Sequence, residues 1–156
     1  MIGKVVDELG VKYEFPVMTE DKDGTQKEVS MPYTEYSVEV IENLKGELSQ
    51  EEPITISKDG GITKDGKFCE LHECDVLPVE GNEYVFYIYA QEDGSNLASG
   101  PNSSIPLSDN HKELSTISEE DMLDRESILE KVRNGVANQI DTGSEKGISK
   151  DDASVK

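Results

Sequence analysis

Two cysteines and a histidine fall within the six residues from position 69 to position 74, and their types are the best suited to chemistry in this chain. Cys69, His72 and Cys74 allow three outcomes: a disulfide, two free structural thiols, or a metal site. A disulfide requires a turn between the cysteines, because a fully extended segment holds them too far apart. Three ligands are too few for a closed zinc site, and no second Cys or His cluster completes it. We therefore expect no metal and favour a disulfide between Cys69 and Cys74.

A catalytic role for either cysteine would need a base that generates the thiolate. His72 is nearby in the sequence, but no other residue supports that role. The sequence therefore predicts no catalytic residue and no cofactor, and we expect that the protein is not an enzyme.

An acidic segment near residue 21 faintly resembles a calcium-binding loop. Asp21, Asp23 and Gly24 are followed by Glu28, but the third acidic position and the full EF-hand spacing are missing. Asp-Gly between two extended segments is a standard hairpin signal, so we predict a plain turn.

Other pairs of like residues have structural explanations. Glu51-Glu52 lies in a polar linker and Glu119-Glu120 at a helix start, where solvation and the helix dipole account for acidic side chains. Gly60-Gly61 lacks the lysine and the following helix of a phosphate-binding loop, and so predicts a bend in a sheet.

Three tyrosines are candidates for a binding face: Tyr33, Tyr87 and Tyr89. Tyrosine combines an apolar ring with a polar hydroxyl, so such residues either contact a ligand or cover the wall of a barrel.

These side chains are expected on an antiparallel sheet built around residues 83–90. This run is apolar or aromatic on both faces, with Tyr84 and Phe86 on one and Val85 and Tyr87 on the other. A strand covered on both faces lies centrally in a sheet or barrel. Further strands are predicted at residues 3–9, 13–17, 33–46, 53–57, 97–99 and 105–107. Within 33–46, Ile41 on the outer face and Glu42 on the inner face break the alternation, which predicts a bulge or sharp bend.

The overall composition excludes several classes of function. Lys and Arg total 15 against 34 Asp and Glu, for a net charge of -19. Such a surface repels phosphate backbones and anionic membranes, so we expect neither nucleic-acid binding nor membrane association. No stretch approaches the roughly 20 apolar residues of a membrane span.

Four fragments, taken in order, resemble a known group of domains: Gly3-Lys4-Val5; Tyr33 to Val40 continuing to Leu44-Lys45-Gly46; Ile54-Thr55-Ile56 followed by Gly60-Gly61; and Pro78 to Ile88. The order is similar to that of poorly characterised cell-surface domains of Gram-positive bacteria, which are similar to the OB-fold barrel of netrin-like domains and tissue inhibitors of metalloproteases. The resemblance covers about the first two-thirds of the chain. It implies an OB-like barrel and an exported or lipid-anchored protein without known catalytic residues. Those inhibitors place an amino-terminal cysteine on the target's metal, and no cysteine lies near Met1.

The expected fold is mainly β: a small OB-like antiparallel barrel over residues 1–107, with a C-terminal helix and a disordered tail. Residues 108–140 form a linker and a helix that packs on the barrel, with Ser118 as its cap. Its apolar stripe contains Met122, Leu129, Val132, Val136 and Ile140. Residues 141–156 are rich in Ser, Gly, Asp and Lys, which predicts disorder.

The expected function is that of a noncatalytic secreted or cell-surface module whose partner is a protein or a cell-envelope ligand. The alternative is a netrin-like inhibitor of an exported hydrolase. The chain is expected to be monomeric, and Met1 runs so directly into a strand that an export signal is expected upstream.

Overall fold

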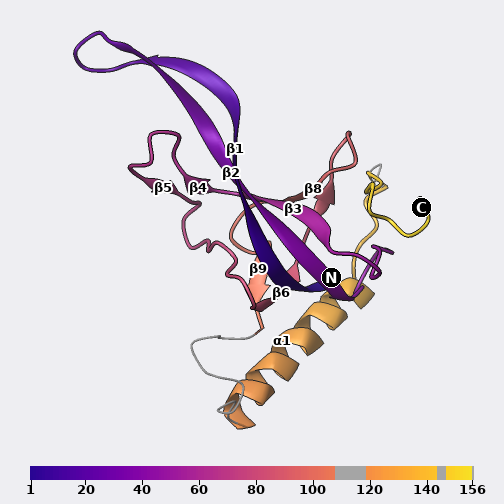
Figure 1. Ribbon diagram of the computed structural model, residues 1–156. Helices are drawn as coiled ribbons and strands as arrows, with labels where there is room; N and C mark the ends of the chain where they lie inside the picture. Colours follow the sequence, from indigo (N-terminus) through magenta and orange to yellow (C-terminus); the bar gives the residue numbers. More distant parts are fainter. Residues whose placement is uncertain (108–118, 144–146, 156) are drawn as a thin grey trace.

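In the part of the chain that the structure describes, seven strands form one curled sheet, accompanied by a small hairpin and one helix (Figure 1). This computed structural model describes residues 1–107, 119–143 and 147–155. The sheet has the order β7-β8-β3-β2-β1-β6-β9, and β4 and β5 pair separately. The elements are β1 (Ile2–Glu20), β2 (Gln26–Glu42), β3 (Ile54–Asp59), β4 (Gly61–Ile62), β5 (Cys69–Glu70), β6 (Glu83–Phe86), β7 (Tyr89–Ala90), β8 (Asn96–Ala98), β9 (Ser104–Pro106) and α1 (Glu119–Ala137). The structure is therefore mainly β, as the sequence predicts.

The curl follows from the short link between β6 and β7. Only Tyr87 and Ile88 separate these strands, yet β6 and β7 lie five positions apart in the sheet order. A flat sheet would place them about 24 Å apart at about 4.8 Å per strand. The chain from Phe86 to Tyr89 spans at most about 11 Å. The sheet must therefore curl into a half-barrel that brings its two margins together.

The same link corrects the prediction of a single strand over residues 83–90. β6 ends at Phe86 and lies between β1 and β9, buried on both faces as expected for a central strand. β7 begins at Tyr89 and pairs with β8 at the other margin. The run is divided because one continuous strand could not serve both margins of a curled sheet.

β1 and β2 form a long hairpin that is curved by irregularities in its pairing. Ile2 faces Glu42 and Gly3 faces Val40, so Ile41 is the extra residue of the predicted bulge. The hairpin turn is confirmed, because the Asp21 carboxylate accepts hydrogen bonds from the backbone N–H groups of Asp23 and Thr25. These bonds explain the acidic residue as a turn cap rather than a calcium ligand.

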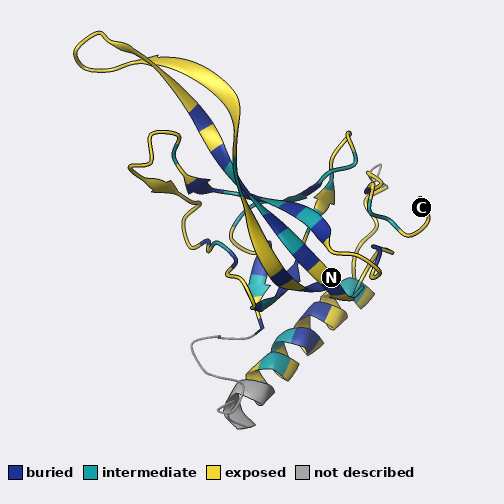
Figure 2. Ribbon diagram, in the orientation of Figure 1, coloured by how far each residue is buried: buried dark blue, intermediate teal, exposed yellow. Residues whose placement is uncertain are grey.

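Two apolar clusters lie on the two sides of the sheet (Figure 2). The first fills the concave side and includes Val38, Ile56 and Phe86. The second joins the sheet to α1 and consists of buried and partly buried residues: Ile2, Val85, Leu107, Leu129, Val132, Leu44, Ile105 and Ile128. The helix therefore covers one side of the half-barrel.

The predicted apolar stripe of the helix is partly correct. Leu129 and Val132 are buried and Val136 is half-buried. Ile140 lies beyond the last helical residue and is 83% exposed, so its inclusion was wrong. Ser118, the predicted cap, lies outside the described residues, and so does the side chain of Met122.

The last residues differ from the disordered tail that their composition predicts. The N–H of Ser49 donates to the carbonyl of Asp151 at 2.8 Å, and the N–H of Ala153 donates to the carbonyl of Glu47 at 2.7 Å. The amide of Asn96 also donates to the Asp151 carboxylate at 2.9 Å. Specific hydrogen bonds to the barrel thus order residues 147–155, and composition alone does not reveal such partners.

No helix in the described part of the chain is long and apolar enough to cross a membrane.

Candidate functional site

The distal part of the β1–β2 hairpin projects from the barrel, and we call residues 13–33 the arm (Figure 1). Several of its apolar side chains are exposed, among them Phe15, Val17, Met18 and Met31 (Figure 2). Phe15 is 63% exposed, and its ring packs edge-on to Tyr33 with the ring centroids 6.4 Å apart. The arm therefore presents an apolar surface rather than contributing it to either core cluster.

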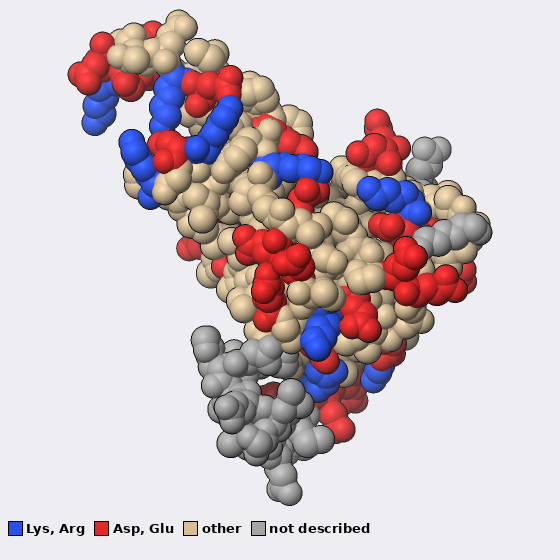
Figure 3. Space-filling model, viewed as in Figure 1, with Lys and Arg blue, Asp and Glu red and all other residues tan. Residues whose placement is uncertain are grey.

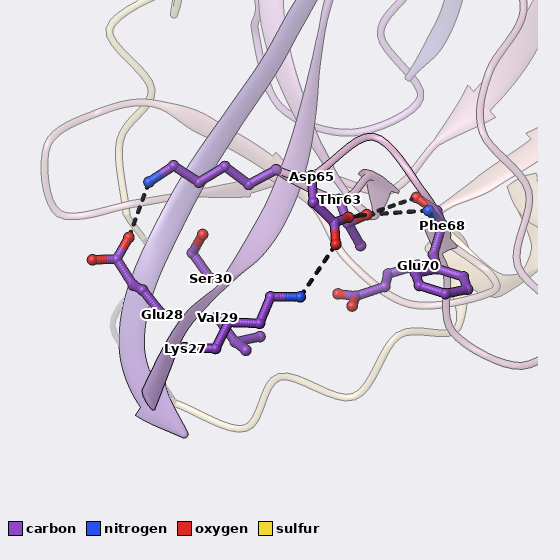
Figure 4. A pocket seen from close by; sticks show the side chains of 9 residues that line it. Lys27, Glu28, Val29, Ser30, Thr63, Asp65, Phe68 and Glu70 are labelled. Carbon is purple, nitrogen blue, oxygen red and sulfur yellow. Dashed lines mark hydrogen bonds and ion pairs between the residues drawn. The ribbon is translucent and has the colours of Figure 1, made fainter. Parts of the chain in front are cut away.

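A cavity of about 400 Å³ lies between β2 and the β4–β5 hairpin, and we call it the groove. Figure 4 shows Glu28 and Ser30 on one side of it and Phe68 and Glu70 on the other. Two ion pairs bridge the sides, from Lys27 Nζ to Asp65 Oδ2 at 3.2 Å and from Lys64 Nζ to Glu28 Oε1 at 2.9 Å. They hold the hairpin against the arm and so maintain the groove.

The groove contains a buried hydroxyl without a partner. Ser30 is only 8% exposed, and no described residue forms a hydrogen bond with its Oγ. Buried polar groups in native proteins normally have partners, so this unsatisfied hydroxyl in the groove lining calls for an explanation. Phe68, 67% exposed, adds an apolar ring to the same lining.

A smaller cavity of about 200 Å³ contains His72 together with Asp59 and Glu70. His72 Nε2 lies 2.8 Å from Asp59 Oδ2, and the Ser99 hydroxyl donates to the same oxygen at 3.0 Å. A catalytic triad instead needs the serine proton directed at the histidine. Asp59 thus accepts both bonds, and the arrangement does not activate Ser99 as a nucleophile. The described residues contain no group of three His, Cys, Asp or Glu side chains placed to hold a metal ion.

Cys69 and Cys74 are free and exposed in the structure, and neither lines the cavity that holds His72. The chain turns at His72–Asp75, where the Asp75 N–H donates to the His72 carbonyl at 3.0 Å. Cys74 itself adopts a left-handed conformation with φ of 63°. The chain thus turns at Cys74 itself, and the disulfide stays a prediction.

The three tyrosines of the predicted binding face lie at separate places. Tyr33 is half-buried on β2, and burial raises its pKa. Tyr89 is 61% exposed on β7, and β3 and β8 lie between these two strands. Tyr87 is exposed in the link between β6 and β7. The pairing register puts Tyr33 and Tyr89 on the same side of the sheet, but at a distance of about three strand spacings.

The groove could not be predicted from the sequence. Its walls come from residues 27–30 and 63–70, which are distant in the chain and are joined only by the fold. No local signal was available, since Ser30 is one of several small hydroxyl residues in β2, together with Thr34 and Ser37.

Comparisons with known proteins give no match: neither a scan against family models, nor a search of curated proteins, nor a search of solved structures finds a similar protein. The resemblance to netrin-like barrels therefore rests on the sequence fragments alone, and the arm and the groove are the structural features that bear on function.

Proposed function

We propose that this chain is a noncatalytic binding module of the bacterial cell surface or of a secreted protein, and that its arm contacts a protein partner. The single observation that carries the proposal is the exposed apolar surface of the arm. Large apolar side chains grouped on one projecting element mark an interaction site, because their burial in a complex is favourable.

The geometry of the arm suits this role. The hairpin is anchored in the half-barrel by the central strands and extends outward without filling a core cluster. Phe15, Val17 and Met18 are all exposed on it. Burying such large apolar side chains against a partner contributes about 1.5–3 kcal/mol each.

The arrangement of the polar residues supports a noncatalytic role. The hydroxyl of Ser99 donates to Asp59 and not to His72, and the two cysteines lie outside the cavity that holds His72. The location at the cell surface is supported by the resemblance alone. Protease treatment of intact cells tests it, since a surface-exposed chain is degraded while a cytoplasmic marker survives.

Photo-cross-linking in cells tests the role of the arm. A benzophenone amino acid replaces Phe15 in one variant and Ile140 in a control, because Ile140 is even more exposed but lies off the arm. We expect a defined protein adduct from position 15 and none from position 140. Absence of an adduct at position 15, or equal adducts from both positions, would contradict the proposal. Tight inhibition of an exported hydrolase by the purified chain would instead support the inhibitor alternative.

A further inference from the structure

We propose that the groove binds an extended peptide segment of a partner protein, which adds to β2 as a further strand. This inference rests on the proposed binding function and specifies the chemistry of the partner. Strand addition uses main-chain hydrogen bonds for affinity and side-chain pockets for selectivity, so both features must be present along β2.

The first feature is an open strand edge. β3 pairs with β2 only from Thr34 to Val38, and among the described strands the arm portion of β2 pairs with β1 alone. The N–H of Thr34 donates to the Gly60 carbonyl, and the Pro32 carbonyl accepts from the Gly60 N–H, both at 3.0 Å. Main-chain groups alternate in direction along a strand, so those of Ser30 and Glu28 point to this same open edge.

The second feature is the unpartnered hydroxyl of Ser30. Ser30 lines the groove, and a rotation of its side chain would present the buried Oγ to a peptide carbonyl or amide that supplies the missing hydrogen bond. Leaving a buried polar group unsatisfied costs about 1–3 kcal/mol, and a ligand that satisfies it recovers that cost.

Side chains define what the peptide must carry. Val29 and Phe68 line the groove and are both exposed, so they form a slot for one apolar side chain. The ion pairs made by Lys27 and Lys64 lie toward the tip of the β4–β5 hairpin. The edge from Lys27 to Met31 is about 13 Å long at about 3.3 Å per residue, which accommodates about four peptide residues.

Charge selects against other occupants. The groove lining carries Lys27 and Lys64 against Glu28, Asp65 and Glu70 and is therefore close to neutral, whereas the whole chain carries -19. Figure 3 shows lysine side chains gathered on the arm and the adjacent hairpin. An uncharged peptide can approach there without repulsion, while a second copy of this acidic chain is repelled. The occupant is therefore an extended segment of a different protein, with an apolar central residue and uncharged neighbours.

Selection from a phage-displayed library of random linear peptides tests the inference on the full chain. The enriched peptide is synthesised with a fluorescent label, and its affinity is measured by polarisation. We expect an apolar central residue, and we expect Phe68→Ser and Ser30→Val each to weaken binding about tenfold. Phe15→Ser, on the arm but outside the groove lining, is the matched control and should leave the affinity unchanged.

Two further measurements test strand addition on the wild-type chain, so their outcome does not depend on whether a variant folds. Methylation of alternate backbone amides of the peptide should abolish binding in one register and spare it in the other. In the wild-type chain, the peptide should slow hydrogen exchange at the amides of Glu28 and Ser30. Failure to enrich a peptide, unchanged affinity in Phe68→Ser, or unchanged exchange at both amides would overturn the inference.

The outcomes separate this inference from the function of the arm. Adducts from position 15 together with no binding in the groove would refute the peptide site and leave the arm as the binding element. Binding in the groove without such adducts would support the peptide site and refute the role of the arm.

Discussion

Lys58 is a fully buried cation on the inner face of the sheet. Its Nζ lies 2.5 Å from Asp75 Oδ2, and it also donates to Ser103 Oγ at 3.0 Å and to the Gly100 carbonyl at 3.2 Å. These bonds tie β3 to two loops. The alternation of Ile54 and Ile56 continues to Lys58, so the sequence could have placed this charge inside the sheet, but not its partner.

The first prediction concerns this ion pair. Lys58→Met removes the cation and leaves the Asp75 carboxylate buried without it, so we expect the free energy of unfolding to fall by about 3–5 kcal/mol. The double variant Lys58→Met/Asp75→Leu should recover much of that loss. Urea denaturation monitored by circular dichroism measures both, and a double variant less stable than the single one would contradict the explanation.

Asp65 carries a lowered pKa in the turn that borders the groove. The hydroxyl of Thr63, the N–H of Lys67 and the ammonium of Lys27 all donate to its carboxylate and lower its pKa from 3.8 to about 2. Because the folded-state pKa lies below the unfolded one, the stabilisation is present above about pH 4 and is lost as the pH falls toward about 2.

We therefore expect an NMR titration of the Asp65 carboxyl group to show a midpoint near 2. In Thr63→Val the first of these donors is absent, and the midpoint should rise toward 3.8. An unchanged midpoint in that variant would assign the shift to other groups.

The cysteines give a residue-scale prediction about covalent structure. Protein refolded under oxidising conditions should contain no free thiols when denatured, because Cys69 and Cys74 are close in the chain and both exposed. Ellman titration with and without reductant measures this. Two thiols in the oxidised sample would show that Cys69 and Cys74 remain unpaired.

At the scale of the elements, the bend after β3 depends on Gly60. Its φ is 114°, and a Cβ at this position would lie 2.7 Å from Leu71 Cδ2 and 2.9 Å from the Glu70 carbonyl oxygen. We expect Gly60→Ala to lower the free energy of unfolding by about 1–3 kcal/mol, measured by urea denaturation. The control is Gly135→Ala in α1, where the space is open and helix propensity predicts a gain of up to about 1 kcal/mol. Equal changes in the free energy of unfolding at both positions would show that the close contacts at Gly60 are not the cause.

Patterns within a single element were enough to predict much of this fold. The Asp23-Gly24 turn, the bulge at Ile41 and the buried pair Leu129 and Val132 all follow from local spacing. The groove and the order of residues 147–155 could not be predicted in this way. Both depend on which distant segments meet, and no periodicity within one segment records that.

At the scale of the whole molecule, the net charge of -19 opposes compaction. Raising sodium chloride from about 0.01 M to about 0.15 M shortens the Debye length from about 30 Å to about 8 Å and screens this repulsion. We expect the free energy of unfolding to rise over that range, with potassium chloride giving the same result. A fall in stability with salt would mean that attractive ion pairs outweigh the repulsion.

The short link of Tyr87 and Ile88 also has a consequence for how the chain folds. Met1 and Phe86 are 85 positions apart and exchange backbone hydrogen bonds, so much of the sheet has high contact order. Proteins of this kind fold in milliseconds to seconds, more slowly than helical bundles. Until both margins meet, nascent strands are open to other chains. The excess of carboxylates lowers the stability of the native state, but it also makes newly synthesised chains repel one another. This repulsion limits aggregation while the half-barrel closes.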